Sequence, residues 1–497
     1  MMPTSFRDAR DPALAAVGVF VWWTVGWLAV GPSFEPGGPV FALYVLLVVS
    51  TVAGRAAGRL RPLPPLVGQL LAGCLLRNLP VVGPAVGAAV HPVSSASART
   101  AALGVILARA GLSLDVAAVW RLRWPASRLA FAPALVEACV VALVAAPALR
   151  LPASHAVTLG FLLAGISPAV VIPSVLSLQE RGYGVEAGVP ALTTTAASVD
   201  VVFAIAGFGA AASTLPGMGS GGAAEAAWRV PAQIVGGCVA GYLAGRALGA
   251  ATPTNPEETK DVEREREGEV PGERRVGEDE REGDVAENRS ASPTTRASGL
   301  MGVALLALFG GARAELTGGA ALAVVVASAT AGYEWGETAS KRAGDALNLA
   351  WTHVAQPMLF ALIGAAVDLE RLDGRTVGLG AVVLAVGLAA RCGTAFAAAG
   401  GGLLGVRERI FVAVAWTPKA TVQAALAGLP LDAAVKAHGV GSIAAERAEV
   451  ILAVGVLAIV VTAPLGAAAV AATGERLLAR KPSSDEEAGD EETVARA

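Results

Sequence analysis

The chain has 497 residues, of which 54% are hydrophobic and only 16% charged, with a formal net charge of −3. The charged fraction lies well below the roughly 25% usual for soluble domains, and the mean hydropathy is +0.59. Apolar blocks approach the length of about 20 residues that crosses a bilayer core. These values exclude a soluble multidomain protein and predict an all-α polytopic membrane protein.

Taken in chain order, the apolar runs predict about 13–14 transmembrane helices. The first run follows Arg7 and Arg10, as a signal peptide would, but similar spans follow it, so we interpret it as an uncleaved first helix. The runs lie near 14–31, 38–54, 64–82, 98–114, 127–148, 154–178, 187–213, 229–250, 299–312, 317–333, 346–367, 377–403, 409–430 and 448–473.

Charges in the connections predict the topology. With both ends in the cytosol, most basic residues of the connections, such as Arg181 and Arg246, fall on the cytosolic side, as the positive-inside rule requires. A charge-dense segment without aromatic residues follows the eighth run, and this composition predicts disorder. A regulatory role for this segment or for the polar tail is an alternative to a purely solvated segment. The expected order is a cytosolic N-terminus (1–13), a first membrane half (14–250), a disordered charged cytosolic loop (251–298), a second membrane half (299–473) and a cytosolic polar tail (474–497).

Four ionisable residues stand inside the apolar runs: Glu137, Asp200, Arg391 and Lys419. Each costs roughly 2.5–3.5 kcal/mol on insertion scales, so such groups face the bundle interior, pair with one another and mark ion pathways. The alternative is that they form buried ion pairs that only hold the bundle together.

Two motifs predict interrupted helices. Ser167-Pro168 lies in "AGISPAVVIPS", and Pro418 lies in "VAWTPKATVQAA". Proline removes an amide donor and clashes with the preceding turn. Freed backbone groups at membrane depth are tolerated only against protein or a water-filled cavity. For either motif alone, an ordinary proline kink is the simpler interpretation.

Together the two motifs indicate an internal repeat. Glu137 precedes Pro168 by 31 residues and Arg391 precedes Pro418 by 27. The core repeats, at about 127–213 and 377–473, start seven spans apart, so equivalent helices run in opposite directions, as in transporters with broken helices at the midplane. Glu137 and Arg391 would be symmetry mates, and their opposite charges favour a salt bridge.

Several motifs resemble those of one family. "SPAVVIPSVLSLQERGYGVEAGVPAL", "VEAC", "PLPPLVGQLLAGCLLRN", "RAGLSLD" and "WTPKATVQAA" are similar, in the same order, to the animal NHA-type sodium/proton antiporters. These form subfamily B of the sodium/hydrogen exchangers, within the cation/proton antiporter superfamily, and the similarity runs from about Gly54 to Lys481. The resemblance implies a homodimer, a six-helix ion-translocating core with crossed broken helices, and exchange of Na⁺ or Li⁺ against H⁺ by an elevator-like motion.

The resemblance also implies roles for the buried charges. Glu137 of "VEAC" and Arg391 of "LAARC" would form a structural ion pair, and Lys419 of "TPKAT" would neighbour the core acids. Asp200 would be the first of the family's paired aspartates.

At that pair the sequence departs from the family. The family reads Ser-Phe-Asp-Asp where this chain reads Ser198-Val199-Asp200-Val201. The second aspartate is the one generally credited with carrying the ion, and a valine has no atom that binds a cation.

These residues lead to two functional hypotheses. A carboxylate shielded from water binds either a proton or a cation, and this competition is the basis of antiport. In the first hypothesis Asp200 is the surviving carrier for Na⁺ or Li⁺, with Lys419 competing for it and oxygen ligands from Ser167, Thr195 or broken-helix carbonyls. In the second, the chain is a non-transporting or regulatory homologue that keeps the fold and the dimer interface.

Other classes of function find little support in the sequence. It contains no Walker loop, GxSxG or HExxH motif, so we do not expect an enzyme. We expect the lipid bilayer as surroundings, no cofactor, no nucleic-acid partner and no metal other than the transported cation. The choice among plasma, endosomal and mitochondrial membranes is open.

Overall fold

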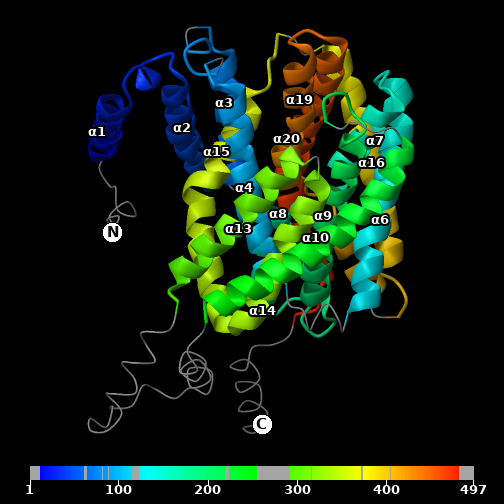
Figure 1. Ribbon diagram of the computed structural model, residues 1–497. Coiled ribbons are helices and arrows are strands. Elements are labelled where there is room, and N and C mark those ends of the chain that lie inside the picture. Colours follow the sequence, from blue (N-terminus) through cyan, green and yellow to red (C-terminus); the bar gives the residue numbers. More distant parts are fainter. Residues whose placement is uncertain are drawn as a thin grey trace, which may run out of the picture. The chain divides into compact units, whose positions relative to one another are not determined.

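The computed structural model defines residues 12–480, apart from 61–63, 81, 88, 115–121, 219–222, 254–290, 315, 371–372 and 403. Most of the charged loop and of the polar tail therefore lies outside the described residues. Within them, the regular elements are helices (Figure 1). They are α1 (Pro12–Val30), η2 (Gly31–Phe34), α2 (Pro39–Arg59), α3 (Pro65–Asn78), α4 (Pro92–Leu112), α6 (Arg123–Ala148), α7 (Ala153–Ala164), α8 (Pro168–Glu180), α9 (Val189–Ala212), α10 (Ala223–Ala251), α13 (Pro293–Arg313), α14 (Thr317–Ala350), η3 (Trp351–Ala355), α15 (Gln356–Ala365), α16 (Gly374–Ala398), α17 (Val406–Ala415), α18 (Thr421–Leu426), α19 (Leu429–His438) and α20 (Ile443–Leu477).

The helical membrane fold expected from the sequence is confirmed. Every one of the fourteen predicted apolar runs contains helix. Among the described residues, nine helical runs are long and apolar enough to cross a membrane. The number is lower than fourteen partly because the broken helix of the second half consists of two pieces, α17 and α18, and because Gly318–Ala365 counts as one run.

Two element boundaries differ from those expected. Helix α13 begins at Pro293, inside the segment predicted to be disordered, because Ser292 caps it by accepting a hydrogen bond from the amide of Thr295 at 3.1 Å. Proline is favoured in the first helical turn, where its missing amide costs nothing. Helix α20 continues to Leu477, past the predicted start of the polar tail at 474.

The described chain divides into two compact units, and each is treated by itself. The first contains residues 1–99 and 356–372, and the second contains 100–355 and 373–497. In the first unit, α3 and α15 touch at their backbones, because Gly73 faces the carbonyl of Ala361 and Gly364 faces that of Leu70. Small residues of this kind allow close helix packing in membranes.

In the second unit, α10 and α14 pack in the same way. Gly237, Gly241 and Gly245 recur every fourth residue of α10 and lie against backbone carbonyls of α14. Helix α14 is kinked at Gly336, whose φ of 75° and ψ of 172° are open to glycine but not to other residues. Just before the kink, Trp335 donates its indole N–H to Thr252 Oγ1 at 3.0 Å.

The second unit also contains the helices around the buried charges. In chain order, α6, the pair α7 and α8, and α9 come from the first half, and α16, the pair α17 and α18, and α20 from the second. The end of α20 lies on the turn between α8 and α9, where Gly184 donates its amide to the carbonyl of Ala479 at 2.8 Å. Arg181 and Glu475, both expected on the cytosolic side, form an ion pair there.

Candidate functional site

Two helix interruptions meet at the centre of the second unit. Helix α7 ends at Ala164 and α8 begins at Pro168, with Gly165 and Ser167 in extended conformations between them. In the second half the chain is non-helical between α17 and α18. The amide of Ser167 donates to the carbonyl of Pro418 at 2.9 Å, so the two breaks contact each other directly. Each break thus satisfies part of the other's freed backbone.

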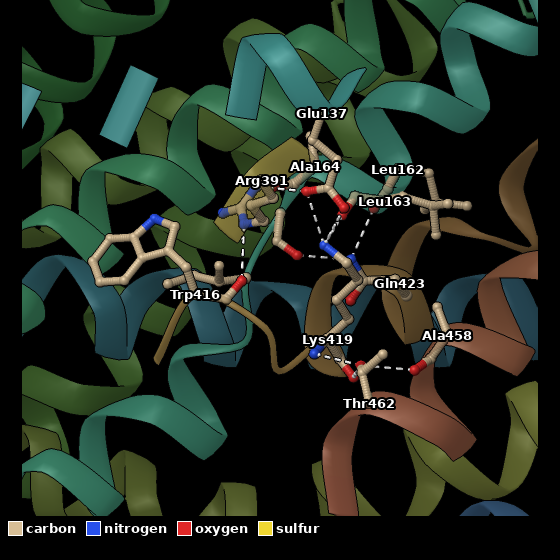
Figure 2. A network of polar contacts seen from close by, with 12 residues as sticks. Glu137, Leu162, Leu163, Ala164, Arg391, Trp416, Lys419, Gln423, Ala458 and Thr462 are labelled. Atoms are coloured by element: carbon tan, nitrogen blue, oxygen red, sulfur yellow. Dashed lines mark hydrogen bonds and ion pairs between the residues drawn. The ribbon is translucent and has the colours of Figure 1, made fainter. Parts of the chain in front are cut away.

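All four predicted charges gather beside these breaks, and all four side chains are fully buried. Arg391 lies between the two acids, with Nη1 at 2.8 Å from Glu137 Oε2 and Nη2 at 2.6 Å from Asp200 Oδ1. Lys419 Nζ lies 2.8 Å from Glu137 Oε1 and 3.0 Å from Oε2 (Figure 2). Two acids and two bases therefore form one continuous network with no net charge.

The pairing within this network differs from the expected one. Arg391 contacts Glu137, as the salt bridge between symmetry mates requires, but it also contacts Asp200. Among the ion pairs of the described residues, Lys419 reaches Glu137 and not Asp200. The competitor for the Asp200 carboxylate is therefore Arg391, because a planar guanidinium presents five donors and can serve two carboxylates at once.

Asp200 faces the first break rather than lipid. Its Oδ2 accepts a hydrogen bond from the amide of Ile166 at 3.0 Å, in the segment between α7 and α8. Since Oδ1 is paired with Arg391, both oxygens have a donor. Val201 beside it is fully buried and brings no ligand atom.

The two predicted helper residues lie in different places. Ser167 is fully buried at the crossing, with its Oγ 3.4 Å from Thr421 Oγ1. Thr195 is buried on α9, the helix of Asp200, but makes no hydrogen bond to that carboxylate in the described structure. The geometry thus gathers Ser167 and the four charges around the breaks and leaves Thr195 one helical turn and more away along α9.

Side chains of the second half cap the broken end of α7. The last carbonyls of a helix have no intrahelical partner and carry partial negative charge. Here each of four consecutive carbonyls has a donor from the second half (Figure 2). The pairs are Leu162 with Gln423 Nε2 (2.8 Å), Leu163 with Lys419 Nζ, Ala164 with Arg391 Nη1, and Gly165 with Gln423 Nε2 (2.9 Å).

Three residues of this site escaped the sequence analysis. Gln423 lies five residues after Pro418 in "TPKATVQAA", and the signal that points to it is an uncharged amide inside an apolar run beside a predicted helix break. Thr462 accepts from the backbone amide of Lys419 at 2.9 Å and donates to the carbonyl of Ala458 at 2.7 Å. Trp416 contributes only its carbonyl, which accepts from Arg391 Nε at 2.9 Å, and no side-chain pattern predicts such a contact.

The site offers oxygen ligands rather than a preformed metal centre. In the described residues, no group of three or more His, Cys, Asp or Glu side chains could hold a metal ion. The available oxygens are two carboxylates, hydroxyls and the carbonyls of the breaks, which are the ligands that hard cations prefer. A cation at Asp200 would have to replace the donors of Arg391 or of the Ile166 amide.

Comparisons with known proteins agree with this architecture. The model of the transmembrane sodium/hydrogen exchanger family matches residues 44–256. Sodium/hydrogen exchanger 9B2 of Mus musculus is 35% identical over 486 residues, covering 96% of this chain and 81% of that protein. Human sodium/hydrogen exchanger 9B1 is 33% identical over 468 residues, covering 93% of this chain and 82% of that protein.

A solved structure shares the fold. The sodium proton antiporter MjNhaP1 from Methanocaldococcus jannaschii superimposes with a TM-score of 0.65 at 15% identity, covering 88% of this chain and 98% of that one. The family resemblance found in the motifs is therefore confirmed over nearly the whole sequence. The chain is a multi-pass integral membrane protein that belongs to the sodium/hydrogen exchanger family.

Proposed function

We propose that the protein exchanges Na⁺ or Li⁺ for H⁺ and that Asp200 is the carboxylate at which the two ions compete. The observation that supports this role is the position of Asp200, fully buried and hydrogen-bonded to the amide of Ile166 in the first helix break. A carboxylate there exchanges a proton or a cation without exposing a charge to lipid. Ser167 and the carbonyls of the breaks supply further oxygen ligands.

Arg391 makes such an exchange feasible with one carrier aspartate. The guanidinium stays protonated in proteins, so it cannot make room for a cation by losing charge. It can shift toward Glu137, its second acidic partner, at 2.8 Å. In this proposal a cation binds Asp200 as Arg391 moves onto Glu137, and protonation of Asp200 releases the cation. The inverted repeats and the homodimer implied by the family resemblance are part of the same proposal.

The test is exchange by the purified chain in proteoliposomes, followed as a pH change driven by Na⁺, Li⁺ or K⁺ gradients. Asp200→Asn should abolish Na⁺- and Li⁺-driven exchange, because the amide does not titrate and carries no negative charge to balance the cation. Asp368→Asn is the matched control, since Asp368 is partly exposed and pairs with Arg77 at 3.4 Å in the other unit. Undiminished exchange by Asp200→Asn would rule the carrier role out.

One observation favours a second candidate, a non-transporting homologue that acts as a partner or regulator. The position where the family carries its second aspartate is the fully buried Val201, and both oxygens of Asp200 already have donors. Val201→Asp separates the two candidates. Exchange gained from an inactive parent would support the non-transporting role, whereas an active parent would exclude it.

A further inference from the structure

Gln423 joins the two halves of the site through one side chain. It is fully buried on α18, and its Nε2 donates to Leu162 O at 2.8 Å and to Gly165 O at 2.9 Å (Figure 2). A primary amide has two N–H donors, and both acceptors are carbonyls, so the contacts fix which way the amide faces. Its Oε1 is buried and has no hydrogen-bond donor among the described residues. A buried amide whose oxygen has no donor costs desolvation energy, so stability alone does not explain its presence.

The two carbonyls that Gln423 occupies flank the two that the bases use, Leu163 O with Lys419 and Ala164 O with Arg391. Lys419 Nζ donates to Leu163 O and to Glu137 Oε2 at 3.0 Å, and it lies 2.8 Å from Glu137 Oε1 as an ion pair. An ammonium has three donors on a flexible stem and is strongly attracted to the uncapped carbonyls of a helix end. With the amide absent, Leu162 O and Gly165 O would become competing acceptors within reach of Lys419.

We propose that Gln423 is a positioning residue of the ion site: by occupying two carbonyls of the α7 end, its amide holds Lys419 on Glu137 and thereby leaves Arg391 to Asp200. The inference rests on the proposed antiport function. Gln423 is neutral and contacts neither acid in the described structure. In this proposal it nevertheless controls which base pairs with Glu137 and which with Asp200.

The way in which Lys419 and Arg391 pair with Glu137 and Asp200 has a measurable consequence. If Lys419 turns toward free carbonyls, Glu137 keeps only Arg391 as a partner, and Arg391 moves away from Asp200. Asp200 then faces less positive charge, so protons compete more effectively for it. We therefore expect the acid-side midpoint of the pH–activity profile to move to higher pH by about one unit, the scale on which a neighbouring charge acts. A loss of packing alone would lower the amount of folded protein without moving this midpoint.

The experiment compares Gln423→Met with the parent in proteoliposomes, because methionine has nearly the same length without the donors. The matched control is Gln69→Met, which removes a buried amide in the other unit, where Gln69 Oε1 accepts from Gln356 Nε2 at 3.2 Å. Both variants should lower the thermal midpoint, but only Gln423→Met should move the pH midpoint. Equal shifts in both variants, or no shift in Gln423→Met, would overturn the proposal.

A second measurement tests the role of Gln423 independently of whether the protein transports ions. Thermal stabilisation of the purified chain by Li⁺ reports cation binding without transport. The pH dependence of this Li⁺ stabilisation is compared between the parent and Gln423→Met. The same comparison is then made with Val201→Asp present in both proteins. A parent that binds Li⁺ without exchange contradicts the antiport function, while a shifted midpoint still supports the role of Gln423. No Li⁺ stabilisation in any background overturns both. Gln423→Asn, with a shorter amide, replaces Gln423→Met if that variant does not fold.

Discussion

At the residue scale, Arg391 is the centre of the buried network. Its three nitrogens donate to Trp416 O, Glu137, Ala164 O and Asp200, so one side chain connects both acids to both halves of the fold. Removing a partner from a buried ion pair leaves an uncompensated charge, which is costly, although the intact pair adds little net stability. The network is therefore better understood as a device that specifies geometry than as a source of stability.

This centrality predicts that Arg391→Lys is not a conservative change. Lysine keeps the charge but offers a single nitrogen with three donors, so it cannot reach all four acceptors. We expect a loss of about 1–3 kcal/mol of stability, the cost of leaving a buried acceptor without its donor, seen as a lower thermal midpoint of the purified protein. Arg77→Lys is the control, because Arg77 is partly exposed and pairs with Asp368 at 3.4 Å, and such pairs contribute about 0–1 kcal/mol. Equal losses in the two variants would contradict the central role.

The sequence predicted the members of the site better than their pairing. Charge at membrane depth pointed to Glu137, Asp200, Arg391 and Lys419, because burial of a charge is costly wherever it occurs. Which base serves which acid depends on distances across the two breaks, and nothing in the local sequence encodes them. The contact of the Arg391 guanidinium with both acids therefore depends on the tertiary structure and cannot be predicted from the local sequence.

At the scale of elements, the apolar runs located the helices well, because length and hydropathy are local properties. The break at Ser167-Pro168 was also predicted, since proline acts on its own backbone. The kink at Gly336 was not predicted, because the polar stretch between the expected runs 317–333 and 346–367 indicated a connection, whereas α14 continues through it. The π-helical turn Trp351–Ala355 has no sequence signature of its own.

The contact between α10 and α14 predicts a sharp difference between two glycines of one helix. A Cβ on Gly241 would lie 2.5 Å from the carbonyl oxygen of Ala323, whereas one on Gly236 would meet no atom within 4 Å. Gly241→Ala should therefore push the helices apart and lower stability by about 1–3 kcal/mol, as overpacking does. Gly236→Ala should be neutral or slightly stabilising, because alanine favours helix over glycine. Thermal midpoints of the two purified variants check this, and equal midpoints would argue against close packing at Gly241.

At the scale of the whole molecule, each half of the second unit supplies hydrogen-bond partners that the other half lacks. The carbonyls of α7 are capped from the second half, and the amide of Ser167 in the first break is satisfied by Pro418 in the second. The same principle holds at the end of α20, which lies on the turn before α9, the helix of Asp200. Because charge and backbone groups are shared in this way, neither half is expected to fold without the other.

The end of α20 gives a prediction about chain length. Leu478 is buried, the carbonyl of Ala479 accepts from Gly184, and Tyr183 and Arg480 form a bridge, so residues 478–480 tie the second half to the turn between α8 and α9. A chain that ends after Arg480 should keep the thermal midpoint of the full chain. A chain that ends after Leu477 should lose this contact, with a lower midpoint and faster proteolysis at Arg181, because the freed turn opens locally. Equal behaviour of the two truncated chains would mean that residues 478–480 do not secure the turn, and that α9 is held by its helix packing alone.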